Sequence, residues 1–390
     1  MKFSNFPYLV QQEILHNMEY SHLFMLSFVS KNLKKFIKSS QITRFKSINS
    51  IVYDDIGGNP PWVYIPGRHK PEMILNFSDY CTHENNSFWL DVCGTMIGFN
   101  FFGFGFPIIF GCPVAYGGPN EPAIKSIHNY LLDLFGSSVE CRCKTSSRAK
   151  QLYPRPIWYI PKLQNLSALS ISCHGEEESL RKVWSDFSMV PVFKHIDFSF
   201  LCLSVVDLHG SIIQRHEFMP KSQKLFPPKC KLYQAESIET TQFYISTPAI
   251  LSLFQGRQAI VKCVFFEISY LIEFMNRWKS GKAFQKLECL QIEKVEDDGD
   301  GRDGDVTDFP QVLDRIGAKY IDETKTPPTH TVPKIHIEFH GANPNTPEIK
   351  SHAYVVRESD KRVASVLIQG RVFQFGVWDK TEEEFLRMME

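Results

Sequence analysis

Residues 6–42 read FPYLVQQEILHNMEYSHLFMLSFVSKNLKKFIKSSQI. Large apolar side chains recur in this stretch at helical spacings, in three short runs. A residue that favours the start of a helix accompanies each run: Pro7 in the first, Ser21 in the second and Ser30 in the third. The stretch therefore predicts a small module of three helices over residues 1–42.

A module of this size lies close to the lower limit for independent folding. Chains below about 40 residues usually need disulfides, a metal or a partner to fold. Part of the apolar surface of residues 1–42 must therefore be buried outside the module, against the rest of the chain or against another protein.

The pattern resembles an F-box, the helical module by which substrate receptors join Skp–cullin–F-box ubiquitin ligases. Phe6-Pro7 stands at the usual Leu-Pro opening, Val29-Ser30-Lys31 matches the Val-Ser-Lys step, and Leu33-Lys34 stands where many F-boxes place a Trp. The resemblance implies docking of a Skp-family adaptor, and through it of a cullin. The residues that it implicates in adaptor binding are Phe6, Pro7, Leu9, Val10, Ile14, Leu15, Leu23, Leu26, Val29, Ser30, Leu33 and Phe36.

Length and composition restrict the class of protein. A chain of 390 residues predicts more than one folding unit, and 43% hydrophobic with 13% aromatic residues can bury a substantial core, which excludes global disorder. The formal net charge is zero, so no global field favours nucleic acid or membrane. No signal-peptide pattern follows Met1 and the ten cysteines form no disulfide framework, so we expect reduced thiols and an intracellular protein, cytoplasmic or nuclear.

Residues 43–150 predict a β-rich region with one helix. Short β-branched or aromatic runs between turn residues indicate strands at 48–53, 62–65, 73–77, 88–93 and 96–102, and an apolar face indicates a helix at 122–136. The stretch from Val92 to Asn120 has no charged residue between its ends. Because it is interrupted by Gly and Pro and has acidic flanks, it predicts buried strands joined by turns and no membrane helix.

Residues 151–293 show a looser repetition. Runs at 163–171, 193–198 and 287–292 share one spacing of apolar residues, with strand-like runs at 237–243 and 259–266 and an amphipathic helix at 271–278. These runs are too apolar for a sheet with one solvated face, so they predict parallel strands with helices on one side. We interpret the segment as an irregular, leucine-rich-like βα array.

A second resemblance covers residues 237–293 and the C-terminus. Trp278-x-x-Gly281 followed by Leu287-Glu288-x-Leu290 is similar to the F-box-associated region of the large nematode-type F-box families. The segments 354–366 and 373–378 resemble their closing hairpin, within a C-terminal β-hairpin region at 335–390. The fold expected is α+β: the helical module, the β-rich region, the βα array and the hairpin.

Residues 294–334 predict an acidic and Pro-containing linker. The stretch 297–305 is acidic and Gly-rich, and Pro327-Pro328 lies further on. A calcium loop of the EF-hand type aligned on Gly301 would have Thr307 at the position that needs a Glu, so we interpret the stretch as a solvated loop.

No catalytic, cofactor or metal constellation emerges from the sequence. Cys141-x-Cys143 lacks the second pair that a zinc site needs, and no paired His motif, P-loop or nucleophile elbow is present. One alternative function stays open. The lysines at 31, 34, 35 and 38 lie on one side of the third predicted helix, as in a helix-turn-helix reader of DNA, although few side chains there could read base edges.

The sequence thus predicts a substrate-recognition subunit that performs no chemistry itself. We expect the N-terminal helices to bind the adaptor and the array after residue 150 to bind an unknown target protein. We also expect residues after about 43 to fold without the helices, because they hold nearly all the aromatic and β-branched core. The rival function is nucleic-acid binding through the basic third helix.

Overall fold

Packing divides the chain into two compact units, each described by itself below. Residues 1–170 form the first unit, and residues 171–338 with 342–390 form the second. The sequence-based boundaries after residues 42 and 150 differ from this division, because the N-terminal helices pack into the same unit as the β-rich region. The computed structural model describes residues 3–54, 62–67, 70–78, 87–101, 107–110, 121–147, 163–174, 192–201, 204–206, 212–215, 229–242, 247–263, 267–295, 309–337 and 342–389.

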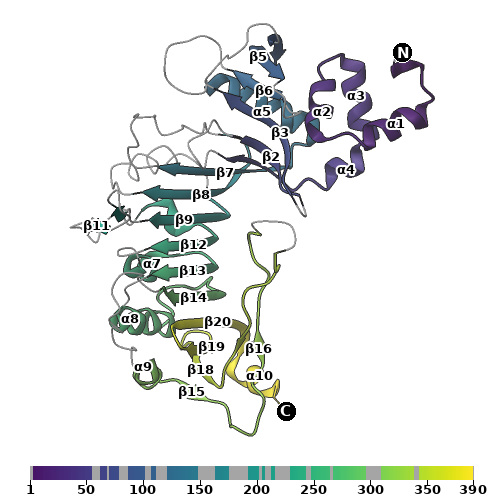
Figure 1. Cartoon of the computed structure of the whole chain (residues 1–390). Helices are drawn as coiled ribbons and strands as arrows, with labels where there is room; N and C mark the ends of the chain where they lie inside the picture. The colour runs from purple at the N-terminus through teal and green to yellow at the C-terminus, as the bar shows by residue number, and fades with distance from the viewer. Residues whose placement is uncertain are drawn as a thin grey trace. The chain divides into compact units, whose positions relative to one another are not determined.

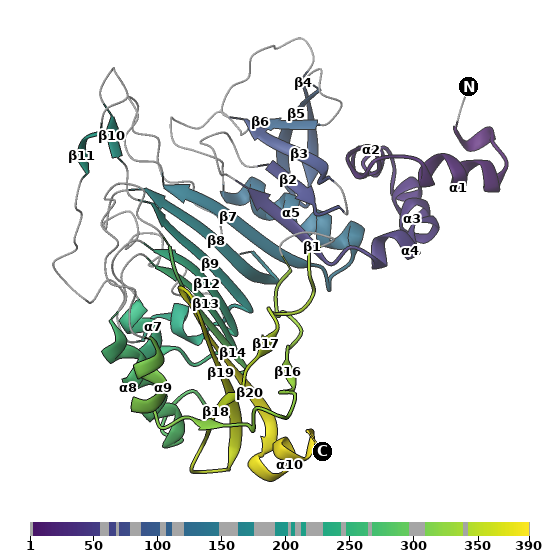
Figure 2. The same cartoon turned by 60° about the horizontal axis from the view of Figure 1, so that its bottom comes forward.

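The first unit begins with short helices that gather in one bundle (Figures 1 and 2). They are η1 (Phe3–Asn5), α1 (Tyr8–His16), α2 (Tyr20–Leu26), α3 (Lys31–Ser40) and α4 (Ile42–Lys46). The three expected helices are present and α4 extends the module beyond residue 42. Ser21 does not start the second helix: Glu19 is its N-cap residue, and Ser21 is buried in the first turn.

A mixed sheet follows, and its strand order is β4-β5-β6-β3-β2-β1-β7. Strand β1 pairs antiparallel with β2 but parallel with β7, and β3 pairs parallel with β6. The elements are β1 (Ser50–Asp54), β2 (Trp62–Ile65), β3 (Glu72–Ser78), β4 (Ser87–Val92), β5 (Thr95–Phe101), β6 (Pro107–Phe110), α5 (Glu121–Phe135) and β7 (Glu140–Ser147). The five strands and the helix expected between residues 43 and 150 are confirmed, whereas β6 and β7 were missed.

Helix α2 shares a hydrophobic core with this sheet and with α5. The Phe24 ring lies edge-on to Tyr130 of α5, with ring centroids 5.8 Å apart, and near Phe99 of β5. Tyr20 lies edge-on to Phe135 at 5.6 Å. Removing the helices would expose rings that they now cover, and the expectation that residues after about 43 fold on their own stays a prediction.

The second unit contains a ladder of parallel strands with crossover helices. Strands β9, β12, β13 and β14 are neighbours in this order and run in the same direction. Figure 1 shows their arrowheads on one side of the stack, and α7 and α8 gathered together. The elements are β8 (Leu166–His174), which carries the boundary between the units, β9 (His195–Leu201), η3 (Lys231–Gln234), β12 (Ser237–Gln242), α7 (Thr247–Leu253), β13 (Gln258–Cys263), α8 (Ile268–Lys279) and β14 (Cys289–Lys294). The expected array of parallel strands is confirmed.

Helix α8 ends in a glycine motif that explains the Trp-x-x-Gly spacing. Gly281 has a φ of +71°. Its N–H donates to the Trp278 carbonyl (2.9 Å) while the Lys282 N–H donates to the Arg277 carbonyl (3.2 Å), which is the Schellman pattern. A side chain at residue 281 would collide with Ser359, so only glycine fits. Trp278 is fully buried, and its ring lies edge-on to Phe375 at 5.0 Å.

Antiparallel strands close the second unit. Strand β20 (Val372–Thr381) pairs with β14 on one side and with β19 (Arg362–Gln369) on the other, which confirms the expected C-terminal hairpin. The remaining elements are β10 (Ser204–Val206) with β11 (Ile212–Arg215), α9 (Phe309–Arg315), β15 (Lys319–Tyr320), β16 (Thr329–His330), β17 (Ile349–Lys350), β18 (Ala353–Val356) and α10 (Glu382–Arg387).

The linker expected over residues 294–334 needs correction. Residues 309–334 contain α9, β15 and β16, and they bury Val312, Ile316 and Ile321. The local sequence is polar, but these few apolar side chains find partners in the second unit. The acidic stretch 297–305 lies outside the described residues.

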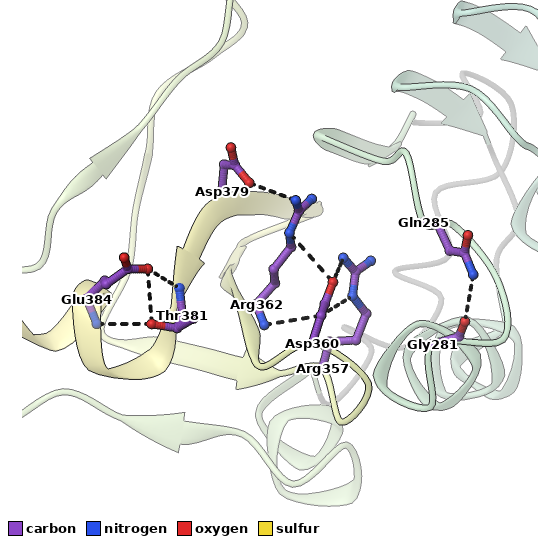
Figure 3. Close-up of polar contacts among 8 residues, drawn as sticks. All are labelled: Gly281, Gln285, Arg357, Asp360, Arg362, Asp379, Thr381 and Glu384. Carbon is purple, nitrogen blue, oxygen red and sulfur yellow. Dashed lines mark hydrogen bonds and ion pairs between the residues drawn. The ribbon is translucent and has the colours of Figure 1, made fainter.

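Polar contacts fix the turn between β18 and β19 (Figure 3). The nearly buried Arg357 guanidinium donates from Nε and Nη2 to the two carboxylate oxygens of Asp360, at 2.8 and 2.6 Å. Arg362 bridges Asp360 and Asp379. These bonds hold the pKa of Asp360 below its ordinary value: the hydrogen bond from Arg357 is the main cause, and burial acts weakly against it.

Candidate partner-binding site

Helix α1 presents the most exposed apolar surface of the N-terminal module. Pro7 lies just before the helix with extended backbone angles (φ −55°, ψ 147°), and its carbonyl accepts the first helical bond from the Gln11 N–H. The Gln11 amide also donates to the Phe6 carbonyl at 2.7 Å, which fixes the entry of the chain. The exposed fractions are 75% for Leu9, 57% for Tyr8 and 41% for Val10.

Helix α3 begins where the sequence predicted. Ser30 is the N-cap, and its hydroxyl oxygen accepts from the Leu33 N–H at 3.1 Å. Val29, just before the cap, is 70% exposed. The Phe36 ring packs against Tyr8 of α1, with centroids 5.5 Å apart, so α1 and α3 are held together by an aromatic contact.

The candidate residues divide by exposure into three groups. Pro7, Leu9, Val10, Val29 and Ser30 are exposed, and Phe6, Ile14, Leu26, Leu33 and Phe36 are half-buried. Leu15 and Leu23 have no exposed surface at all. Their assignment to adaptor binding stays a prediction, but in the free chain both leucines belong to the core, because helical spacing indicates that a side chain is buried and not what buries it. The exposed Tyr8 was missed, although it directly precedes Leu9.

Side chains of α2 and of the turn after it fix the module to α5. The Phe28 ring stacks on Tyr130 at 4.2 Å with an interplanar angle of 13°. The Ser27 hydroxyl lies 2.8 Å from the Tyr130 hydroxyl. Burial raises the pKa of Tyr130 to about 12, against a smaller opposite effect of the Ser27 hydrogen bond. Tyr130 therefore stays protonated and can take part in this buried hydrogen bond.

Arg44 connects α4 to the turn between α1 and α2. Its guanidinium donates to the Met18 and His16 carbonyls, at 2.6 and 3.1 Å, and lies over the Tyr20 ring, 4.1 Å from the centroid. It also pairs with Glu72 of β3 at 3.4 Å. One cation thus satisfies carbonyls at the end of a helix and joins the module to the sheet.

The basic face of α3 is partly used inside the chain. Lys34 and Lys38 pair with Asp133 of α5, at 2.6 and 2.7 Å, and the Lys34 ammonium lies 3.5 Å from the Tyr130 ring centroid. Burial pushes the pKa of Asp133 upward, but the two lysines outweigh it and hold the pKa below its ordinary value. Two of the four lysines on which the nucleic-acid alternative depended are therefore paired inside the chain with one carboxylate, whose charge offsets one of the two.

The described residues offer no grouping of His, Cys, Asp or Glu that could hold a metal ion. Cys141 and Cys143 are buried in β7, where they belong to the core. Within the same part of the chain, no helix is both long enough and apolar enough to span a bilayer. The stretch weighed as a calcium loop falls among residues that the structure does not describe.

Comparison with known proteins agrees with the geometry of the N-terminal helices. Residues 3–45 match the F-box domain, a range that covers η1 to α3 and nearly all of α4. These helices therefore match an F-box domain, and the chain is of the α+β class, with the matched helices followed by a large mixed sheet. F-box domains generally bind a Skp-family adaptor and thereby serve as substrate adaptors of ubiquitin ligases. No curated protein and no solved structure shows a significant match to the chain.

Proposed function

We propose that this chain is the substrate-recognition subunit of a Skp–cullin–F-box ubiquitin ligase and performs no chemistry itself. The observation that carries the proposal is the coincidence of the F-box match with an exposed apolar surface on the matched residues. We define the α1 surface as Tyr8, Leu9 and Val10. Large apolar side chains next to each other and in water favour a protein partner.

The contribution of this contact to binding follows from the exposed side chains. Burying an aliphatic side chain that is exposed in the free chain stabilises a complex by about 1.5–3 kcal/mol. The α1 surface with Val29 could therefore supply several kcal/mol, before the cost of association is subtracted. The half-buried Leu26, Leu33 and Phe36 would add contact area without reorganising the core.

A charge-introducing variant tests the adaptor-binding proposal. The double variant Leu9→Asp and Val29→Asp should abolish co-purification with a Skp-family adaptor, because it places two carboxylates in an apolar interface. Both positions are exposed in the free chain, so the fold should be unaffected.

A matched control is available within the same module. Ile42 on α4 is 53% exposed but was not implicated in binding. Ile42→Asp should leave the adaptor complex intact. Retention of the adaptor by the double variant, or equal loss in the Ile42→Asp control, would contradict the assignment of the α1 surface.

We assign target binding to the second unit, which would make the chain a nematode-type F-box protein with an F-box-associated domain. Two observations support this: the parallel ladder gives a rigid frame, and the Trp278–Gly281 motif forms the sharp helix end that precedes β14. Tethering a target near the ubiquitin-charged enzyme raises its effective concentration, which is how such a subunit promotes a reaction without catalytic residues. The chain would work inside the cell, in cytoplasm or nucleus.

A further inference from the structure

An extended segment of the second unit crosses one face of the parallel ladder. We call residues 330–336 the strap. At one end the His330 ring packs on Gly376 of β20, so closely that a Cβ on residue 376 would lie 2.5 Å from the His330 Nδ1. At the other end the His336 ring stacks on His195 of β9, with centroids 4.1 Å apart. The strap therefore runs across the strands from β20 to β9.

The middle of the strap is bonded by Gln258 of β13 and also by residues 344–346, since the Lys334 N–H donates to the Pro344 carbonyl at 2.7 Å and the Thr346 N–H to the Val332 carbonyl at 2.8 Å. The Gln258 carboxamide donates to the Pro333 carbonyl at 2.7 Å and accepts from the Ile335 N–H at 3.1 Å. Both bonds are made to backbone groups of the strap, so they do not depend on its side chains. The first row of the ladder thus contains one side chain that bonds the backbone of an extended segment of the same chain.

The residues under the strap form one row across the sheet. Strand pairing places them opposite each other, in the order His195, Ser237, Gln258, Cys289, Gly376. Four strand spacings span about 19 Å, and an extended chain of six residues spans about 20 Å. The length of the strap therefore matches its path over this first row.

Counting one row for each residue along the strands, the third row lies two residues beyond the first and faces the same side of the sheet. Side chains alternate between the faces of a sheet, and Phe375, in the row between, packs under Phe274 and Trp278 of α8. The first and third rows therefore lie on the face away from α8. The third row is Asp197, Glu239, Ile260, Gln291 and Gln374, and the fifth is Ser199, Thr241, Lys262, Glu293 and Val372, all half-buried.

The third and fifth rows together carry an excess of negative charge. Glu239 and Glu293 bring two carboxylates against the single ammonium of Lys262. Lys262 contacts Glu239 at 3.3 Å, and their side chains remain 36% and 38% exposed. A partner that approaches these rows meets accessible carboxylates on a sheet, and their charge favours a basic segment.

The third row also contains glutamine side chains, whose hydrogen-bonding groups are like those of Gln258 in the first row. The Gln374 amide donates to the Gln291 carbonyl oxygen at 3.2 Å. Within the described residues, the Gln291 NH₂ group and the Gln374 oxygen make no other hydrogen bond. These two groups form a donor and an acceptor side by side, which is what Gln258 offers to the strap.

We propose that the third and fifth rows bind an extended, basic peptide segment of a partner protein, which runs across the strands beside the strap. Gln291 and Gln374 bond its backbone, and Glu239 and Glu293 attract its lysine or arginine side chains. The inference rests on the proposed function, since it names the kind of target segment that the second unit captures. An acidic segment would be repelled by the carboxylates of these rows.

The test uses the full chain and peptides of defined charge. The probe is a fluorescein-labelled ten-residue peptide of alternating Lys and Thr, and the comparison is the matched Glu–Thr peptide, both measured by fluorescence anisotropy at low salt. We expect saturable binding of the Lys–Thr peptide, about tenfold tighter than that of the Glu–Thr peptide, a factor that corresponds to about 1.4 kcal/mol. N-methylation of alternate backbone nitrogens should weaken the Lys–Thr peptide, because it removes donors that the glutamines read.

Variants locate the peptide on the face. Glu293→Lys should weaken the Lys–Thr peptide by about tenfold, and the pair Gln291→Ala with Gln374→Ala by a similar factor. The matched control is Glu273→Lys, the same charge change at an exposed position on α8. It should leave the affinity within about twofold, because α8 packs on the opposite face of the ladder.

Several outcomes would overturn the inference. These are no saturable binding of the Lys–Thr peptide, equal losses in Glu293→Lys and Glu273→Lys, tighter binding of the Glu–Thr peptide, and self-association abolished by Glu293→Lys. Adaptor co-purification with each variant keeps the two proposals apart. Loss of peptide binding with retained adaptor contradicts only this inference, whereas normal peptide binding without adaptor binding contradicts only the proposed role of the F-box.

Discussion

The shared core of the first unit predicts that a substitution in the F-box module destabilises the sheet. Phe24 on α2 is fully buried and contacts Phe28, Tyr130 and Phe99. Phe24→Ala would remove a ring that the module and the β-rich region both pack against. If the two fold as one body, the change lowers the stability of both.

The magnitude follows from the burial and the ring geometry. Truncating a fully buried phenylalanine to alanine costs about 3–5 kcal/mol. The edge-on contacts of Phe24 with Phe28 and Tyr130, at 5.1 and 5.8 Å, add to the area term, so we expect the upper part of this range, about 4 kcal/mol. For a unit of this size that corresponds to a fall in Tm of about 8–16 °C.

Buried cysteines provide the assay. Cys141 in β7 is inaccessible in the folded first unit, whereas Cys263 and Cys289 are buried in the second. Thiol labelling followed by peptide mass spectrometry therefore reports the opening of each unit separately. When opening and closing are fast compared with labelling, a loss of about 4 kcal/mol should accelerate labelling of Cys141 by roughly 10³-fold.

A surface variant and the second unit supply the controls. Leu9→Ala changes an exposed side chain of the same module and should shift stability by less than about 0.5 kcal/mol. Labelling of Cys263 and Cys289 should stay unchanged in Phe24→Ala. If Cys141 labels at the parent rate in that variant, the helices and the sheet do not share a cooperative core and the reasoning fails.

Three further predictions concern the second unit. Burial is the main reason why the pKa of His330 lies below its ordinary value of 6.5, so the stability that the neutral ring provides is complete above about pH 6.5 and falls as the pH drops toward the folded pKa. In His330→Gln, the free energy of unfolding from urea titrations should therefore depend less on pH between about pH 7 and 5. The same pH dependence in the parent and the variant would contradict a buried neutral ring. Asp360→Asn should destabilise the unit by about 2–3 kcal/mol in thermal unfolding, because it leaves the nearly buried Arg357 without its counter-charge; a shift below about 0.5 kcal/mol would refute this. Replacing the aspartates of 297–305 with Asn should slow association of the Lys–Thr peptide at low salt and matter less at high salt, and equal rates at low salt would make the stretch a connector only.

Part of the fold could be predicted because its signals are local. The N-cap at Ser30, the helix at 122–136 and the strand at 62–65 each rest on residues next to one another in the chain, and the structure places them where the spacing indicates. The Trp278–Gly281 spacing is of the same kind, since a positive φ at the end of a helix needs glycine. The order of the elements follows from such signals.

Tertiary contacts decided which side chains are buried and which groups the charged side chains pair with. Apolar spacing selected Leu9, Leu15 and Leu23 alike, yet the fold buries the last two completely and leaves Leu9 in water. The pairing of Lys34 with Asp133 has the same cause, since the two residues are far apart in the chain and meet only when α3 lies against α5.

The sequence by itself determined the F-box helices, the order of strands and helices along the chain, and the α+β class, because each depends on the period of apolar residues or on one cap. Only the tertiary structure decided that β7 joins β1 in parallel and that the strap crosses from β20 to β9. The physical reason is that local spacing records which residues avoid water, while the choice of partner depends on how distant segments fit together in space.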